Sequence, residues 1–208
     1  MKNHFLRLFA GLLFLLLSIQ TGLAADSLAF SDTAGSPYED QIDYLSEKGI
    51  VNGYADGTFR PNNRINRAEF VKLIVEQLKG KPSVNDYEDC FKDVKTGWFE
   101  PYVCYAKEKG MVNGYPDGTF MPSNTINKVE ALKIVVSAYD LDLENDVELP
   151  FDDIDEDSWY IGYLKTAFAH NLLKEKSGHF GPGNLMTRGE MSDIIYRLFS
   201  VLEYAGEL

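Results

Sequence analysis

The sequence predicts a mostly α-helical protein built from three helix-loop-helix repeats. One stretch occurs three times: over residues 49–61 and 65–69, over residues 110–122 and 126–130, and as a divergent copy over residues 171–182 and 186–190. Its equivalent phenylalanines Phe59, Phe120 and Phe180 are separated by 61 and 60 residues. Apolar side chains on both sides of each copy recur every three or four residues, which is typical of amphipathic helices. A fixed period indicates one structural block that is used repeatedly.

The first helix of each repeat follows a Phe-x-Asp motif, which begins at Phe30, Phe91 and Phe151. In the second repeat this helix is expected from about Trp98 to Lys109, with an apolar face that includes Val103. A residue that tolerates left-handed backbone then ends each first helix. These residues are Gly49, Gly110 and Asn171.

A tight turn and a second helix complete each repeat. The second helices begin at capping boxes, in which a polar residue precedes Glu by three positions. The boxes are Asn66 to Glu69, Asn127 to Glu130 and Thr187 to Glu190. The apolar face that follows the first box is predicted to comprise Phe70, Leu73, Ile74 and Leu78.

One such block cannot bury its apolar faces alone, whereas three stacked blocks can, so we expect one compact domain. Its expected divisions are repeat one at residues 26–80, repeat two at 81–140 and repeat three at 141–208.

Residues 1–25 are expected to form a secretory signal peptide. Lys2 and Arg7 precede an uncharged, mostly apolar run, and Gly22-Leu23-Ala24 offers small residues for cleavage. The alternative is an uncleaved membrane anchor, although the run is short for a span of about 20 residues. Cleavage would remove two positive charges and change the net charge from −12 to −14. This charge argues against nucleic acid as a partner, and no later stretch predicts a membrane span.

Cys90 and Cys104 are the only two cysteines, and both lie in the second repeat. In an exported chain an isolated pair predicts a disulfide bond, with two buried free thiols as the alternative.

The motifs Phe-x-Asp, Gly-Tyr-x-Asp-Gly-Thr-Phe-x-Pro and Ile-Asn-Arg-Ala-Glu recur in one order, together with Trp98 and Trp159. In this they resemble S-layer homology domains over nearly all of the chain after the signal. The resemblance implies a pseudo-threefold arrangement of the three repeats around a central helical bundle. It also implies non-covalent attachment to the bacterial cell envelope, through a secondary cell wall polysaccharide that often carries pyruvate ketals in that family.

The resemblance implies that the basic residue of each box contacts the ligand. That position is Arg67, Lys128 and Arg188 here. An Arg at a helix start can grip a carboxylate beside unpaired backbone N–H groups. Arg60 and Arg64 are expected to flank the same place as Arg67, which makes repeat one the preferred site. Trp98 and Trp159 would stack on a sugar ring, a role that comes from the resemblance.

Simpler roles stand beside these. Arg67 could pair with a loop carboxylate such as Asp56, and both tryptophans could be core residues. Residues 153–157 resemble the start of a calcium loop, but the Gly and Glu that an EF-hand requires are absent. No catalytic constellation is legible, and neither a metal nor a cofactor is predicted.

The sequence therefore predicts an exported, non-enzymatic cell-surface module that binds a cell wall polysaccharide or another peptidoglycan-linked polymer. The alternative is a structural or protein-interaction module, which binds another surface protein and lacks sugar binding.

Overall fold

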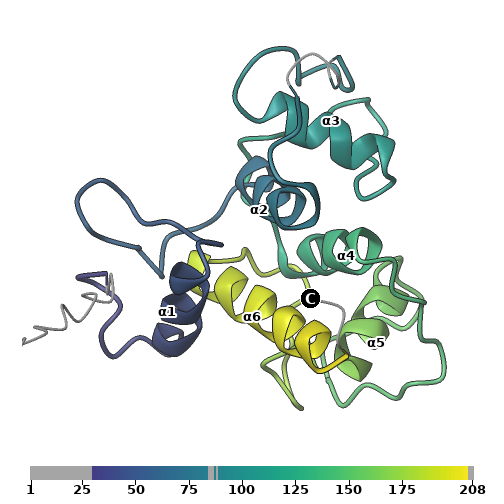
Figure 1. The fold of residues 1–208 in the computed structure, drawn as a ribbon. Coiled ribbons are helices and arrows are strands. Elements are labelled where there is room, and N and C mark those ends of the chain that lie inside the picture. Colours follow the sequence, from purple (N-terminus) through teal and green to yellow (C-terminus); the bar gives the residue numbers. More distant parts are fainter. Residues whose placement is uncertain (1–29, 84–86, 88, 206–208) are drawn as a thin grey trace, which may run out of the picture.

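The computed structural model describes residues 30–83, 87 and 89–205. Six helices and no β-strand are present in this part of the chain, so the mostly helical prediction is confirmed (Figure 1). The helices are α1 (Glu39–Glu47), α2 (Arg67–Lys79), α3 (Glu100–Glu108), α4 (Lys128–Ala138), α5 (Ile161–Ala169) and α6 (Arg188–Ala205). The predicted signal peptide at residues 1–25 lies outside the described residues.

The second helix of each repeat starts where its capping box predicts. Asn66 caps α2 by accepting a hydrogen bond from the Glu69 backbone N–H, and the Glu69 carboxylate accepts one from the Asn66 N–H. The same reciprocal pair joins Asn127 to Glu130 and Thr187 to Glu190. These bonds satisfy backbone donors that have no partner inside the helix.

Helix-ending residues also behave as predicted. Gly49, Gly110 and Asn171 follow α1, α3 and α5 with φ angles of 70°, 73° and 58°. The α1 and α3 positions carry glycine, which adopts this conformation without steric cost, and asparagine is among the few other residues that tolerate it.

Each second helix packs against the first helix of the next repeat. Helix α2 contacts α3, α4 contacts α5, and α6 returns to α1 (Figure 1). Three backbone hydrogen bonds complete the ring: Ile65 N–H to Met186 O, Met186 N–H to Ile126 O, and Ile126 N–H to Ile65 O, at 2.9 to 3.2 Å. This cyclic order is compatible with the expected pseudo-threefold arrangement, whose symmetry itself stays a prediction.

Buried apolar side chains from all three repeats form one continuous core. Phe59, Phe70 and Phe120 are among its largest fully buried members. The predicted inclusion of Leu78 is wrong, because this side chain lies near the end of α2 and is exposed. Helical periodicity identifies a face, but the length over which a neighbour covers that face depends on packing.

The Phe-x-Asp motif ties the start of each repeat to its loop. Both carboxylate oxygens of Asp32 accept backbone N–H groups, from Phe59 and Arg60, at 2.7 Å. Asp93 and Asp153 make the equivalent pairs of bonds. In the second repeat a disulfide between Cys90 and Cys104 adds a covalent tie to α3, which confirms the predicted pairing.

Candidate ligand sites between repeats

The basic residue that begins each second helix extends into the loop of another repeat. Its side-chain nitrogen donates to the carbonyl oxygen of that loop's buried phenylalanine, from Arg67 to Phe120 at 2.9 Å, from Lys128 to Phe180 at 3.1 Å and from Arg188 to Phe59 at 2.8 Å. We name these places by the repeat that supplies the loop. Site 1 contains Arg188, site 2 contains Arg67 and site 3 contains Lys128.

Arg67 is almost enclosed at site 2, with 6% of its surface exposed. Its guanidinium lies 3.1 Å from a Glu130 carboxylate oxygen, and its Cζ lies 4.9 Å from the centre of the Tyr115 ring. The Tyr115 hydroxyl donates to the same Glu130 oxygen at 2.7 Å. Pairing of Arg67 with Asp56 is therefore wrong, since Asp56 binds Arg60 instead.

A cavity of about 550 Å³ opens beside Arg67. This volume lies within the usual range for small-molecule pockets. Residues that line it include Asn113, Asn127, Lys133 and Trp159. Trp159 is 58% exposed, so its expected alternative role as a core residue is wrong. Its indole offers an apolar face at the mouth of the cavity.

Lys133 is the functional candidate that sequence reasoning missed. Its ammonium lies 5.6 Å from the centre of the Trp159 ring. Within the described ranges 30–83, 87 and 89–205, no carboxylate oxygen comes within 4 Å of it. The repeats carry a signal for it, because Lys133 and Lys72 both lie five residues after the basic helix start. Glu76 pairs with Lys72 one turn later in α2, whereas Ser137 occupies that position in α4.

Site 1 collects several cations around the first loop. Arg188 also donates to the Asn52 carbonyl oxygen at 3.0 Å, and its Cζ lies 5.1 Å from the centre of the Tyr54 ring. Arg60 covers the same ring at 4.0 Å and pairs with Asp56 at 2.7 Å. Burial lowers the pKa of Arg188 from its ordinary value. Trp98 is 53% exposed, so a core role is wrong for it too.

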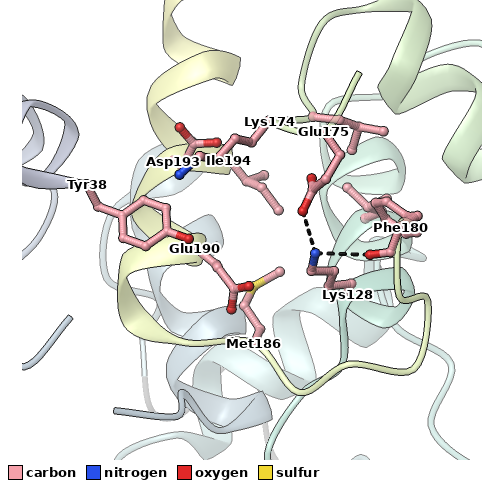
Figure 2. Close-up of a pocket in the computed structure, with 11 residues that line it drawn as sticks. Tyr38, Lys128, Lys174, Glu175, Phe180, Met186, Glu190, Asp193 and Ile194 are labelled. Carbon is pink, nitrogen blue, oxygen red and sulfur yellow. Dashed lines mark hydrogen bonds and ion pairs between the residues drawn. The ribbon is translucent and has the colours of Figure 1, made fainter. Parts of the chain in front are cut away.

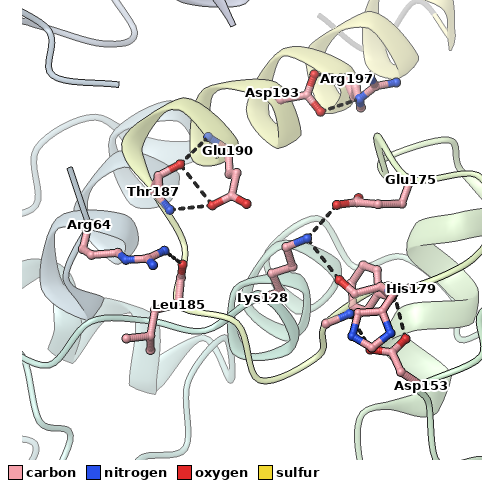
Figure 3. A network of polar contacts seen from close by, with 12 residues as sticks. Arg64, Lys128, Asp153, Glu175, His179, Leu185, Thr187, Glu190, Asp193 and Arg197 are labelled. Atoms are coloured by element: carbon pink, nitrogen blue, oxygen red, sulfur yellow. Dashed lines mark hydrogen bonds and ion pairs between the residues drawn. The ribbon is translucent and has the colours of Figure 1, made fainter. Parts of the chain in front are cut away.

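The grouping of Arg60 and Arg64 around Arg67 is a wrong expectation. Arg60 shares Tyr54 with Arg188, and Arg64 donates to the Leu185 carbonyl oxygen (Figure 3). The reason is tertiary, because each basic helix start serves the loop of a different repeat. Arg60 is therefore placed at site 1, while Arg67 is placed at site 2.

Site 3 contains an internal ion pair. Lys128 Nζ lies 2.6 Å from a Glu175 carboxylate oxygen, and Figure 2 shows both of its bonds, to Glu175 and to the Phe180 carbonyl oxygen. Glu175 comes from the loop of the third repeat, which lacks the Tyr-x-Asp-Gly turn of the other two.

The acidic residues near this loop do not make a convincing metal site. Ligand atoms of Asp152, Asp153 and His179 lie within 4.8 Å of one another. Both Asp153 oxygens, however, already accept backbone N–H groups, from Phe180 and Gly181. Burial alone would raise the pKa of Asp153, but these two bonds and nearby His179 lower it. Farther along, Asp155 accepts bonds from the Asp157 N–H and the Ser158 hydroxyl, as expected of a local turn.

No helix in the described part of the chain is long and apolar enough to span a membrane.

Comparison with known proteins gives a family match and several similar proteins. The S-layer homology domain matches residues 29–71, 91–132 and 150–192. The chain is 30% identical over 157 residues to a cellulosome-anchoring protein of Acetivibrio thermocellus, covering 73% of this chain and 35% of that relative. It is 30% identical over 182 residues to S-layer protein EA1 of Bacillus anthracis, covering 85% of this chain and 21% of that relative.

Some relatives are enzymes by name, including a cell wall amidase of Bacillus anthracis that is 27% identical over 82% of this chain. That alignment covers 32% of the amidase, and the chain spans about a third or less of the curated relatives described here. The shared region is the S-layer homology part, which points to a non-catalytic module. The family and its surface-layer relatives support an exported protein of the cell surface or cell wall. With three matches that together span more than half of its residues, the chain belongs to the S-layer homology domain family.

Proposed function

We propose that this chain holds itself on the cell envelope by binding an acidic saccharide of a secondary cell wall polysaccharide at site 2. The single observation that carries the proposal is the cavity of about 550 Å³ that combines Trp159 with Lys133. The module has no catalytic role in this proposal. Its place as a cell-surface anchoring protein agrees with the family and with the names of its relatives.

The cavity offers complementary chemistry for a charged sugar. The exposed Trp159 indole supplies a flat apolar surface for the C–H face of a sugar ring. Lys133 supplies a positive charge that no carboxylate of the described residues neutralises. Asn113 and Asn127 add polar groups to the lining. A carboxylate of the ligand, such as that of a pyruvate ketal or a uronic acid, would lie against Lys133.

Arg67 has a different part in the proposal from the one that its motif implies. Its guanidinium already serves Phe120 and Glu130, so a ligand carboxylate would have to share it. We assign Arg67 to shaping the cavity wall and adding positive potential, with Lys133 as the direct contact. Site 1, with Arg188 and Arg60, is the second candidate for the same class of ligand.

Calorimetric titration of the secreted chain with purified, fragmented wall polysaccharide tests this assignment. The variant Lys133→Ala/Trp159→Ala should lower the affinity of site 2 at least about tenfold, since each lost contact is worth on the order of 1 kcal/mol. Lys95→Ala is a suitable control, because Lys95 pairs with Asp89 in an exposed loop outside the cavity lining.

Two outcomes would contradict the proposal. One is wild-type binding to polysaccharide-bearing wall that persists unchanged after the polymer has been removed. The other is unchanged affinity in the double variant with a native circular dichroism spectrum. The chain length of the polymer should stay constant during incubation, and shortening would reject the non-catalytic assignment.

A further inference from the structure

Site 3 leaves far less space for a ligand than site 2. Its cavity measures about 30 Å³, against about 550 Å³ at site 2. The smaller volume accommodates about one or two water molecules and is far below the size of ordinary ligand pockets. Figure 2 shows Tyr38, Glu175 and Glu190 around the Lys128 ammonium in this space.

Glu175 closes the site from the loop side. Its carboxylate lies 2.6 Å from Lys128 Nζ, and the two side chains are 32% and 11% exposed. The equivalent loop at site 2 runs through Asn113, Gly114 and Tyr115, so it carries no carboxylate in the place of Glu175. The loop of the third repeat is one residue shorter and reads Lys174-Glu175-Lys176.

The surrounding charges also differ between the two sites. Asp193 lies five residues after the basic residue that begins α6, at the position that Lys133 holds in α4. Asp193 pairs with Arg197 at 2.7 Å, and both Asp193 and Glu190 line the cavity. Burial first, and then Glu190, Asp193 and Glu175, raise the pKa of Tyr38 to about 12. Three carboxylates therefore line site 3 together with two lysines, Lys128 and Lys174, and one of these lysines is already paired with Glu175.

Tyr38 forms part of the wall of this small cavity. A Cβ atom built on Gly189 would lie 2.3 Å from the Tyr38 ring, which explains why glycine replaces the alanine of the box in the third repeat. The first repeat has Pro37 where the other two have Trp98 and Trp159. Site 3 consequently lacks an exposed indole at the position that Trp159 holds in site 2.

We propose that the Glu175 carboxylate takes the place of a ligand carboxylate at site 3. It pairs with Lys128 and thereby closes the site to acidic saccharides. This inference rests on the proposed function, because it assumes that the open sites take such a ligand. A carboxylate tethered in the same chain has an effective concentration on the order of millimolar or above. It therefore excludes free acids that bind with millimolar affinity.

Differential lysine acetylation tests the closure without a ligand. Treatment of the whole secreted chain with N-hydroxysuccinimidyl acetate, followed by peptide mass spectrometry, gives a rate for each lysine. Lys128 should react at least about tenfold more slowly than exposed Lys176 in the wild type. Glu175→Ala should raise the Lys128 rate about tenfold. Glu156→Ala is the matched control, because it frees Lys165 from its ion pair and should leave Lys128 unchanged.

The same measurement with fragmented wall polysaccharide separates this inference from the proposed function. The fragments should slow acetylation of Lys133 but not of Lys128 in the wild type, and should slow both in Glu175→Ala. Protection of Lys133 without any protection of Lys128 in Glu175→Ala would overturn the closure and leave site 2 standing. Protection of neither lysine in either chain would overturn both. A wild-type Lys128 that reacts as fast as Lys176 would overturn the closure by itself.

Discussion

Arg67 of the first repeat and Glu130 of the second form an ion pair across the repeat boundary, with 3.1 Å between guanidinium nitrogen and carboxylate oxygen. The other Glu130 oxygen accepts the Asn127 N–H at the start of α4. One carboxylate therefore caps a helix and holds a neighbouring repeat. The basic residue of the repeated box thus has a structural role in addition to any role in ligand binding.

Loss of the Arg67 side chain should destabilise the protein strongly. Arg67→Ala leaves Glu130 without its cationic partner in an interior setting, which costs about 3 kcal/mol of unfolding free energy. Arg60→Ala is the control, because the Arg60–Asp56 pair is exposed to solvent and should contribute much less to stability. Urea unfolding followed by circular dichroism measures both, and equal effects of the two changes would argue against a structural role for Arg67.

Removal of the disulfide should also lower stability. The bond between Cys90 and Cys104 closes a segment with a sequence separation of 14, for which loop entropy predicts about 3 kcal/mol. Cys90→Ser/Cys104→Ser should therefore unfold at a lower urea concentration than the oxidised wild type. Reductant should shift the wild-type midpoint in the same direction and leave the double variant unchanged; a shift in the variant would point to another cause.

Replacing a carboxylate of the Phe-x-Asp motifs should destabilise the fold, even when the replacement is conservative. Asp93 accepts two backbone N–H groups, from Phe120 and Met121, at 2.8 and 2.7 Å. An asparagine side chain keeps one acceptor oxygen but turns an NH₂ donor toward the other N–H. Asp93→Asn should therefore cost about 2 kcal/mol, which denaturant unfolding would reveal. Exposed Asp142, whose replacement by alanine should cost under about 0.5 kcal/mol, provides the comparison.

The pKa of Asp56 offers a test of the first loop in solution. Hydrogen bonds lower the pKa of Asp56 from 3.8 to about 2. The bond from the Thr58 hydroxyl is the largest cause, and the bond from Arg60 is the next. Because the folded-state pKa is depressed, this carboxylate stabilises the fold above its unfolded pKa. That contribution is lost as pH falls toward 2. Carboxyl NMR titration should show the pKa rising in Thr58→Val, and rising less in Arg60→Ala. The reverse order would contradict the hydrogen-bond pattern of this loop.

Much of the local structure could be predicted because it depends on residues close in the sequence. The capping boxes, the helix-ending residues Gly49, Gly110 and Asn171, and the Cys90–Cys104 bond all join positions separated by few residues. Their geometry follows from backbone sterics and short-range hydrogen bonding. The exposure of Leu78 could not be predicted in this way, because burial at the end of a helix depends on how far a neighbouring element extends.

The composition of each site could not be read in the same way. Arg60 lies seven positions before Arg67, the first residue of α2, yet their side chains serve different loops. The sequence alone does not identify Lys133 as a site residue. The structure does, because it places Lys133 beside Trp159 and away from carboxylates.

The three helix-loop-helix repeats, their caps, one disulfide and three basic helix starts can be predicted from the sequence alone, because these features are encoded within short segments. Which loop each basic side chain enters, and which carboxylate it meets, depends on the packing of the repeats. The repeats pack in a closed ring, so each second helix lies against the following repeat. Contacts across those boundaries join residues more than 40 positions apart, and their charges and volumes act on one another only after the ring has formed.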